Sequence, residues 1–294
     1  MFNIITPTYN RAHTLERVYE SLKNQTYKSF SWIIIDDCSS DTTKSLVNQW
    51  LSDNIIDIEY HFLAKNKGKS NAVNVALDLC DQPYVIIADS DDSFDSNTLS
   101  DLKDTWNKID TDVNGLNVAS IWTLTKRNTG EIIGDKFPKD YWRVDFNERV
   151  LRHTITGEKW ASWRTSILKD QKMYHTEHGC HIPESLTWNS INKTYDFVCI
   201  NLAHRTYFES SDGLIATKKS TKKRAKIGFY IGYYGLKDVT INDLLKYPFY
   251  HNYAFEWIKA KPYFKDEHLK LSLKKQVVAS FLFIKVALKK LLNK

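Results

Sequence analysis

Asp89 and Asp91 have the residue type and the spacing of a pair that can hold a metal ion. They belong to YVIIADSDDSF, residues 84 to 94, in which an apolar run leads directly into three carboxylates. Carboxylates this close make one another's ionisation more costly, so we expect a cation beside them. Asp89 and Asp91 can offer oxygen ligands to Mg²⁺ or Mn²⁺, although such a pair is also common by chance. We expect Asp92 to point away from the metal and to tie the loop.

A second acidic cluster, DDCSSD, occupies residues 36 to 41. A carboxylate just beyond a strand, such as Asp37, can accept hydrogen bonds from a ribose hydroxyl or a base N–H group. The same cluster can be an Asx-rich turn in which Asp41 caps the following helix. The two roles use different residues, so they are compatible.

A third cluster, NKGKSNAVN at residues 66 to 74, combines Gly68 and two lysines with the expected start of a helix. Main-chain N–H groups at a helix N-terminus, helped by Lys67 or Lys69, suit a phosphate or another anion. The sequence contains neither G-x-x-x-x-G-K-[ST] nor G-x-G-x-x-G. It therefore does not favour an ATPase or a dinucleotide-binding enzyme.

Four apolar runs rich in β-branched and aromatic residues occur in the first hundred residues, at 2–6, 30–36, 56–62 and 84–89. Helix-like segments lie between them, which is typical of a parallel α/β sheet with both faces covered. Ligands of such sheets bind beyond the carboxyl ends of the strands. We therefore expect the clusters TPTYNR, DDCSSD and DSDD to meet at one edge.

The helix-like segments carry apolar residues at helical spacing. TLERVYESLKNQ follows the first run, with Thr14 as a possible N-cap, and SNAVNVALDLC precedes the fourth, with Ser70 as its expected N-cap. A third segment, DTTKSLVNQWL, lies between the second and third runs. Strand and helix thus alternate throughout this part of the chain.

The second half of the chain is less regular. We predict strands at 118–126 and 197–208, a strand followed by a helix at 160–170, and a helix at 183–191. The remainder is basic and aromatic, with two predicted helices around Pro248. The predicted fold class is α/β, a mostly parallel central sheet flanked by helices, with a helical C-terminal extension.

The composition argues against several classes of protein. An apolar fraction of 42% argues against disorder, and 294 residues suffice for one large domain or two modest ones. The four cysteines are widely spaced and no secretory signal precedes the first strand, which predicts a cytoplasmic protein. We expect no nucleic-acid partner, because no recognition module is visible.

The net charge of +6 is concentrated late in the chain, in residues 218–226 and 274–290. Such clusters can meet nucleic acid, anionic lipid or a phosphorylated substrate, or can form a solvated face. The run 277–292 is too short and too rich in lysine to span a membrane. It can lie on an anionic membrane as a basic helix or dock on the domain.

Four motifs resemble glycosyltransferase family 2 in their order and spacing over about the first 100 residues: TPTYNR, DDCSSDTT, NKGKSNAVNVAL and IIADSDDSF. Three later segments more loosely resemble the acceptor half of bacterial capsule and lipopolysaccharide sugar transferases, over residues 157 to 215: GEKWASWRTSIL, IPESLTWNSI and TYFESSDGLI. Each motif is weak alone, and the ordered set is specific.

The resemblance implies a Rossmann-like GT-A domain over residues 1–215, with a nucleotide-sugar-binding half at 1–100 and an acceptor half at 101–215. A basic helical extension would occupy 216–294. The implied reaction is inverting transfer of a sugar from a nucleotide sugar, with UDP favoured, to a saccharide or lipid-linked acceptor in cell-surface polysaccharide biosynthesis. Mn²⁺ or Mg²⁺ would neutralise the leaving diphosphate. The implied location is the cytoplasm, with peripheral contact at the inner membrane face.

The resemblance also implies roles for individual residues. Asp89 and Asp91 fall on the family's D-x-D metal motif, with Asp91 as the more direct ligand. The residues that would contact the nucleotide sugar are Pro7, Tyr9, Arg11, Asp37, Lys69, Asp89 and Ser90.

Glu184 matches the acidic residue of the family's acceptor half, which makes it the candidate base for the acceptor hydroxyl. A Glu after Pro183 is also explained by the favourable position of a carboxylate at a helix N-terminus. Asp212 is a second candidate base, or part of a lid near Gly213.

Two features depart from the family pattern. Cys38 stands where the family usually has Gly, so a turn that requires a positive φ is less secure there. His175, His178, Cys180 and His181 lie close together, but their spacing matches no paired zinc site. We therefore interpret them as a polar loop that leads to Glu184, with a structural zinc site as the lesser alternative.

Two other functions compete with a glycosyltransferase. A noncatalytic sugar-nucleotide-binding subunit would keep the donor pocket but lack a working base. A metal-dependent phosphohydrolase would use the aspartates alone, and would have no need of TPTYNR or NKGKSN.

Overall fold

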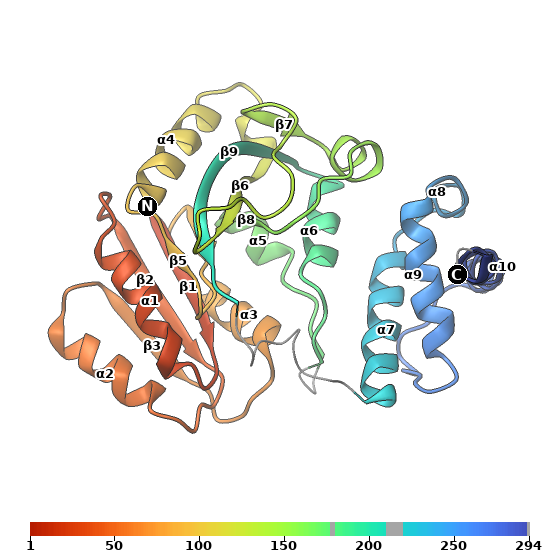
Figure 1. The fold of residues 1–294 in the computed structure, drawn as a ribbon, viewed down its shortest axis with the longest axis horizontal. Helices are drawn as coiled ribbons and strands as arrows, with labels where there is room; N and C mark the ends of the chain where they lie inside the picture. Colours follow the sequence, from red (N-terminus) through yellow and green to blue (C-terminus); the bar gives the residue numbers. More distant parts are fainter. Residues whose placement is uncertain (177–179, 210–219, 293–294) are drawn as a thin grey trace. The chain divides into compact units, whose positions relative to one another are not determined.

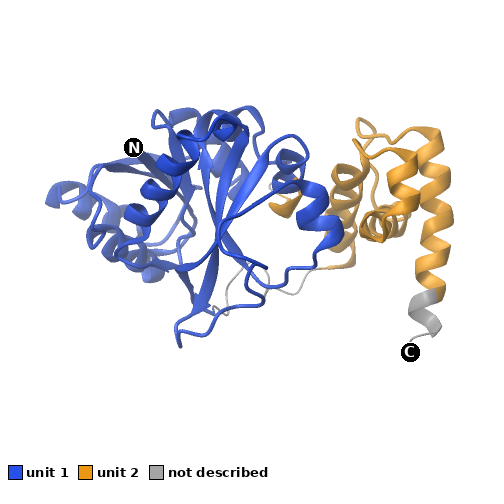
Figure 2. Cartoon of the chain, turned by 90° about the horizontal axis from the view of Figure 1, so that it is seen from above, with its two compact units in different colours: residues 1–179, 187–209 blue, residues 180–186, 210–294 orange. Residues whose placement is uncertain are grey.

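The computed structural model describes residues 1–176, 180–209 and 220–292 (Figure 1). Contacts between Cα atoms divide the chain into two compact units (Figure 2). The first unit comprises residues 1–179 and 187–209, and the second comprises residues 180–186 and 210–294. Asp89 and Asp91 belong to the first unit, and Glu184 belongs to the second.

The first unit is built on a nine-stranded sheet whose main path is β3-β2-β1-β4-β8-β6-β9-β5, with β7 paired to β9. The strands are β1 (Phe2–Thr8), β2 (Phe30–Asp36), β3 (Ile58–Phe62), β4 (Tyr84–Ile87), β5 (Ser93–Phe94), β6 (Val118–Arg127), β7 (Trp142–Val144), β8 (Lys159–Arg164) and β9 (Asp196–Tyr207).

The first four strands are parallel, as the alternation of strands and helices predicts. Antiparallel pairing begins where β8 joins β4, and β6 joins β8 in the same way. The direction changes here because the chain beyond β4 no longer alternates regularly between strand and helix. The sheet is therefore parallel over β1 to β4 and mixed in the remainder.

Helices cover both faces of this sheet. One face packs against α1 (Ala12–Lys23), α2 (Thr43–Asp53) and α4 (Thr98–Asp110). The other packs against α3 (Lys69–Leu79), α5 (Thr165–Asp170) and α6 (Ser185–Asn192). Neighbouring strand residues divide between the two cores, with Ile4 in the first and Ile5 in the second, as the period of a strand requires. Two short helical turns complete the unit, η1 (Gly115–Asn117) and η2 (Asn147–Arg152).

Both predicted N-caps are wrong. The helix α1 begins at Ala12, with Arg11 as its N-cap, and the Thr14 hydroxyl instead donates a hydrogen bond of 2.9 Å to the Ser90 carbonyl. The helix α3 begins at Lys69, with Gly68 as its N-cap at φ +88°. Tertiary hydrogen bonding and a glycine turn override the local preference of Thr and Ser for capping positions.

The second unit contains α7 (Thr221–Leu236), α8 (Ile241–Lys246), α9 (Pro248–Ala260) and α10 (Leu273–Leu292). The predicted break around Pro248 is confirmed, because α9 begins at this proline. Gly232 lets α7 approach α9 closely, since a Cβ atom there would lie 2.3 Å from the Trp257 Cβ. On α9, Phe255 stacks on Phe283 of α10, with ring centroids 5.0 Å apart. None of the helices within the described ranges is long and apolar enough to cross a membrane.

Candidate functional site at the strand ends

The register of the parallel strands brings the predicted polar clusters to one edge of the sheet. Thr8 at the end of β1 pairs with Asp36 at the end of β2, and the Asp37 N–H group donates to the Thr8 carbonyl at 2.8 Å. Beyond β4, the Ala88 N–H group donates to the Ile5 carbonyl at 2.9 Å. Residues 7–11, 36–41 and 89–92 therefore leave the sheet on the same side.

Asp89 has two cationic neighbours. The Lys69 Nζ atom lies 2.5 Å from its Oδ1 atom, and an Arg205 guanidinium nitrogen lies 3.9 Å from its Oδ2 atom. Burial raises the pKa of Asp89, but the positive charges of Lys69 and Arg205 outweigh burial, so that the net shift is downward. Asp89 is therefore held ionised, and 28% of its side chain stays exposed at the edge.

Asp91 has a different environment. Burial and the negative charge of Asp89 raise its pKa, and Arg11, Lys69 and Arg205 lower it by less. Arg17 donates to the main-chain carbonyl of Asp91 at 3.2 Å. Within the described ranges, no side chain forms a hydrogen bond or ion pair with the Asp91 carboxylate. A half-buried carboxylate with a raised pKa, and with no bonded partner among the described residues, is one that a cation would stabilise.

Asp92 is fully buried and lies 2.5 Å from the Nε atom of Arg205, so its carboxylate is used inside the protein, as predicted. Arg205 also pairs with Glu158 at 3.0 Å. Burial raises the pKa of Asp92, and Arg205 opposes that rise. Arg205 thus neutralises the acidic segment from the neighbouring strand β9.

Sequence reasoning missed Arg205. It stands in HRTYF, within the segment that was correctly predicted as a strand. The signal that could have drawn attention to it is an arginine inside a run apolar enough to be buried, because a buried arginine requires an acidic partner. The identity of that partner depends on how the sheet is assembled.

Asp37 shapes the loop that precedes α3. Its carboxylate accepts hydrogen bonds from the main-chain N–H groups of Lys67, at 2.9 Å, and Gly68, at 2.6 Å, and its side chain is buried. These contacts fix the segment that delivers Lys69 to Asp89. Asp37 therefore has a positioning role in this structure, and a contact with a nucleotide base would use the remaining lone pairs of the same oxygens.

The other predicted nucleotide contacts lie around the end of β1. Pro7 is buried within β1, Tyr9 is 47% exposed, and Ser90 is buried. The main-chain N–H group of Arg11 donates to the Thr43 hydroxyl at 3.2 Å. Of this group, Tyr9 is the side chain most open to a ligand.

The turn at Cys38 has a left-handed backbone, with φ +70°. The conformation that a glycine would favour at this position is thus formed by a cysteine, and its thiol lies 3.8 Å from the Ala64 carbonyl. A residue with a Cβ atom in this region stores strain of roughly 1 kcal/mol or more.

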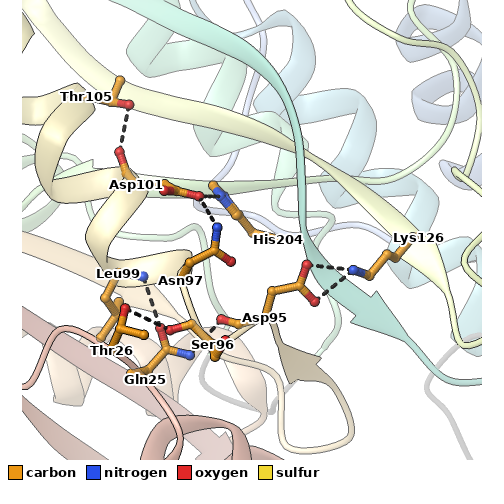
Figure 3. A network of polar contacts seen from close by, with 10 residues as sticks. All are labelled: Gln25, Thr26, Asp95, Ser96, Asn97, Leu99, Asp101, Thr105, Lys126 and His204. Carbon is orange, nitrogen blue, oxygen red and sulfur yellow. Dashed lines mark hydrogen bonds and ion pairs between the residues drawn. The ribbon is translucent and has the colours of Figure 1, made fainter.

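A polar network fixes the chain just beyond the aspartates (Figure 3). Lys126 on β6 contacts both carboxylate oxygens of Asp95, at 2.7 and 2.6 Å, and Gln25 donates to the Asp95 carbonyl at 2.8 Å. His204 on β9 lies 3.1 Å from Asp101 on α4. The segment from β5 to α4 is thereby bound to β9, the neighbour of β5 in the sheet, and to β6 beside it.

Glu184 is half-buried in the turn before α6, next to Pro183. Asp212, the other candidate base, lies outside the described residues. The same is true of His178, one of the residues considered for zinc. The described part of the chain contains no group of three or more His, Cys, Asp and Glu side chains placed to hold a metal ion. His175 instead lies 3.3 Å from Asn74.

Residues 3–183 match the family Glycosyl transferase family 2. The match covers more than half of the chain and includes every strand-end cluster described above. The chain belongs to this family. The resemblance inferred from the motifs is therefore confirmed.

Several relatives of known function are similar to the chain. A GalNAc(5)-diNAcBac-PP-undecaprenol β-1,3-glucosyltransferase of Campylobacter jejuni is 28% identical over 247 residues, 82% of this chain and 74% of that protein. The Staphylococcus aureus poly(ribitol-phosphate) β-N-acetylglucosaminyltransferase TarS is 27% identical over 185 residues, 60% of this chain and 30% of that protein. The relatives thus act on lipid-linked or polymer acceptors.

Solved structures share the fold. S. aureus TarS 1–349 in complex with UDP-GlcNAc superposes with a TM-score of 0.67 at 20% identity, over 96% of this chain and 79% of that one. A Pyrobaculum calidifontis mannosyltransferase with GDP-Man and Mn²⁺ gives 0.57 at 19% identity, over 98% and 79%. The predicted GT-A fold, an α/β sheet flanked by helices, is confirmed.

The residues at this edge fit a divalent cation. Asp89 and Asp91 provide hard oxygen donors of the kind that Mg²⁺ and Mn²⁺ prefer. The Asp91 carboxylate has no bonded partner in the described part of the chain, so it and Asp89 are the side chains that would hold such an ion.

Proposed function

We propose that this glycosyltransferase transfers a sugar from a nucleotide sugar, most favourably a UDP-sugar, to a saccharide or lipid-linked oligosaccharide, with inversion at the anomeric carbon. The observation that carries the proposal is the pair Asp89 and Asp91 at the sheet edge of a family 2 fold. Asp89 is ion-paired, and the Asp91 carboxylate has no bonded partner among the described residues. The solved TarS complex with UDP-GlcNAc supports UDP as the nucleotide.

We propose that Asp91 is the direct ligand of Mn²⁺ or Mg²⁺ and that Asp89 is the second carboxylate of the site. When bound, the ion supplies Lewis-acid neutralisation of the leaving diphosphate. Lys69 lies beside Asp89, where its ammonium group can contact a phosphate oxygen. The proposed contacts with the base and the ribose come from Tyr9 and Arg11, and from the segment that Asp37 holds. Pro7 and Ser90 lie in the backbone next to these contacts.

We propose Glu184 as the general base. Its carboxylate takes the proton of the acceptor hydroxyl, and the oxygen attacks the anomeric carbon from the face opposite the nucleotide. The bond between the anomeric carbon and the diphosphate oxygen breaks, and the nucleoside diphosphate leaves with the electron pair. The proton on Glu184 is then returned to solvent.

The proposed acceptor carries phosphate and is used in cell-surface polysaccharide synthesis, of the capsule or lipopolysaccharide type, at the inner face of the membrane. The names of two relatives support this, since one contains a lipid diphosphate and the other a poly(ribitol-phosphate). Within this chain, the exposed residues Lys222, Lys223 and Arg224 in the first turn of α7 give a positive surface suited to phosphate.

Turnover assays and thermal shift together test the proposal. A panel of nucleotides and nucleotide sugars, with and without Mn²⁺, should show a metal-dependent rise in melting temperature for the cognate donor. Glu184→Gln should keep that rise, because it leaves the donor site intact, and should lower kcat with donor and acceptor by about 10²- to 10⁴-fold.

The matched control is Glu267→Gln, an exposed glutamate of the same unit, which should leave kcat unchanged. Full activity of Glu184→Gln would exclude it as the base. Donor binding without turnover, in the presence of candidate acceptors, would instead support a noncatalytic sugar-nucleotide-binding subunit. Release of inorganic phosphate from simple esters would favour a phosphohydrolase.

A further inference from the structure

The helix α10 carries an apolar face that no other described part of the chain covers. Five large apolar side chains on it are 54 to 76% exposed, and we call them the α10 stripe: Leu273, Val277, Phe281, Ile284 and Leu288. Placed at about 100° per residue, they span an arc of about 80° on one side of the helix. Isolated exposed leucines are ordinary, but a continuous stripe of this length marks an interaction surface.

The opposite side of α10 packs against other helices of the same unit. Ala279 and Leu282 are buried, and Phe283 stacks on Phe255 of α9. Lys275 donates to the carbonyls of Leu236 and Lys237 at the end of α7. The helix is therefore anchored by one face, and the α10 stripe is not the face that folding requires.

Charge distinguishes between the possible partners of the stripe. The exposed residues Lys274 and Lys285 border it on one side, at about 100° and 120° from Leu273 on the same helical projection. The helix contains five lysines and no carboxylate. A second copy of α10 would bring lysines toward lysines, whereas an anionic lipid surface complements them.

We infer that α10 lies in the interface of an anionic bilayer, with the α10 stripe among the acyl chains and Lys274 and Lys285 at the headgroups. An apolar face bordered by lysines, on a helix that is not apolar enough to span a membrane, is the arrangement of interfacial helices. The inference rests on the proposed lipid-linked acceptor for its purpose, because it would hold the enzyme at the surface where such an acceptor resides.

Flotation of the full chain with lipid vesicles tests the inference without donor or acceptor. We expect binding to phosphatidylcholine vesicles that contain about one third phosphatidylglycerol, and little binding to phosphatidylcholine alone. The double variant Phe281→Ser/Ile284→Ser should reduce the partition coefficient at least tenfold for each residue changed. The matched control is Leu245→Ser/Tyr263→Ser, which alters two equally exposed residues of the same unit outside the stripe.

The lysines are tested separately. Lys274→Gln/Lys285→Gln should lower binding to the anionic vesicles by about fivefold per lysine, and added salt should have the same effect. Lys265→Gln, an exposed lysine outside α10, is the control. All these positions are exposed, so the variants should melt at the temperature of the unmodified chain.

Three outcomes would overturn the inference: equal binding by the stripe variant and its control, equal binding to neutral and anionic vesicles, or a dimer in sedimentation velocity that Phe281→Ser/Ile284→Ser dissociates. Turnover on a water-soluble acceptor separates this inference from the proposed function. The stripe variants should keep it unchanged, so loss of vesicle binding with full turnover would leave the enzyme assignment intact.

Discussion

Three neighbouring aspartates occupy three different environments. Asp89 is ion-paired with Lys69, Asp92 is buried against Arg205, and the Asp91 carboxylate has no bonded partner within the described ranges. The pKa of Asp89 is lowered, whereas the pKa values of Asp91 and Asp92 are raised, because the balance of burial, positive charge and negative charge differs at each residue. Residue type alone therefore does not assign their roles.

Substitution of the aspartates should separate binding from stability. Asp91→Asn should abolish the Mn²⁺-dependent thermal shift by the donor. It should also stabilise the ligand-free protein by up to about 1 kcal/mol, because it removes a carboxylate whose raised pKa reports an unfavourable charge. Thermal-shift measurements with donor and Mn²⁺ check the first effect, and chemical denaturation of the ligand-free protein checks the second.

Asp92→Asn should show the reverse balance. It removes the close ion partner of the buried Arg205, and we expect this loss to outweigh the relief from the burial that raises the pKa of Asp92. The free energy of unfolding should therefore fall, by at most roughly 3 kcal/mol, while metal-dependent donor binding persists in weakened form. Asp104→Asn, an exposed residue, should change stability by less than about 0.5 kcal/mol. Loss of metal-dependent binding in Asp92→Asn alone would reassign the direct metal ligand.

At the scale of elements, β9 connects the acidic edge to α4. His204 and Arg205 are consecutive residues of a strand, so their side chains leave it on opposite faces. Arg205 reaches Asp92, and His204 reaches Asp101 on α4 (Figure 3). One strand thus supplies both the neutralising cation of the site and a tie to the helix that covers the sheet.

The stability that depends on the contact of His204 with α4 should change with pH. Burial lowers the pKa of His204 below its ordinary 6.5, and Asp101 and Asp95 oppose that shift without reversing it. His204 therefore binds a proton more readily in the unfolded chain than in the folded one. Its contribution to the free energy of unfolding is fully present above about pH 6.5 and is lost as the pH falls toward the pKa of the folded state. The slope for this one group is at most about 1.4 kcal/mol per pH unit.

Urea denaturation between pH 8 and pH 5 measures this dependence. The loss of stability below pH 6.5 should be smaller in His204→Gln than in the unmodified chain, because glutamine does not titrate. Parallel pH profiles for the two proteins would mean that His204 does not contribute to the pH dependence.

At the scale of the whole molecule, the chain divides into two compact units (Figure 2). The first is organised around the sheet and the second around α7, α9 and α10. A ligand that binds only the folded first unit should stabilise that unit by mass action, by about 2.7 kcal/mol at a hundredfold excess over Kd.

Differential scanning calorimetry should therefore resolve two transitions, of which UDP with Mn²⁺ raises one. The control for binding at the proposed metal site is Asp91→Asn. Addition of UDP with Mn²⁺ to this variant should raise neither of its two transitions. A single transition that shifts as a whole would show that the two units unfold cooperatively.

The sequence by itself determined the parallel half of the sheet and the strand-end clusters. Runs such as 30–36 and 84–89 are local patterns, and the carboxyl ends of parallel strands must meet at one edge whatever the details of packing. The order of the motifs likewise sufficed for the family. The N-caps at Thr14 and Ser70 were predicted wrongly because local preference was overridden by a distant hydrogen bond and by a glycine turn.

Only the tertiary structure decided how the charges are balanced and which apolar residues are exposed. Arg205 meets Asp92 because β9 and the segment after β4 share one sheet, a pairing of residues far apart in the chain that no local pattern encodes. The residues of the α10 stripe are apolar, as are those on the buried side of the same helix. Only the packing of α10 on α9 shows which of the two sides stays exposed in the described structure. Local sequence specifies strand and helix, whereas the partner of a charge or an apolar face is set by long-range packing.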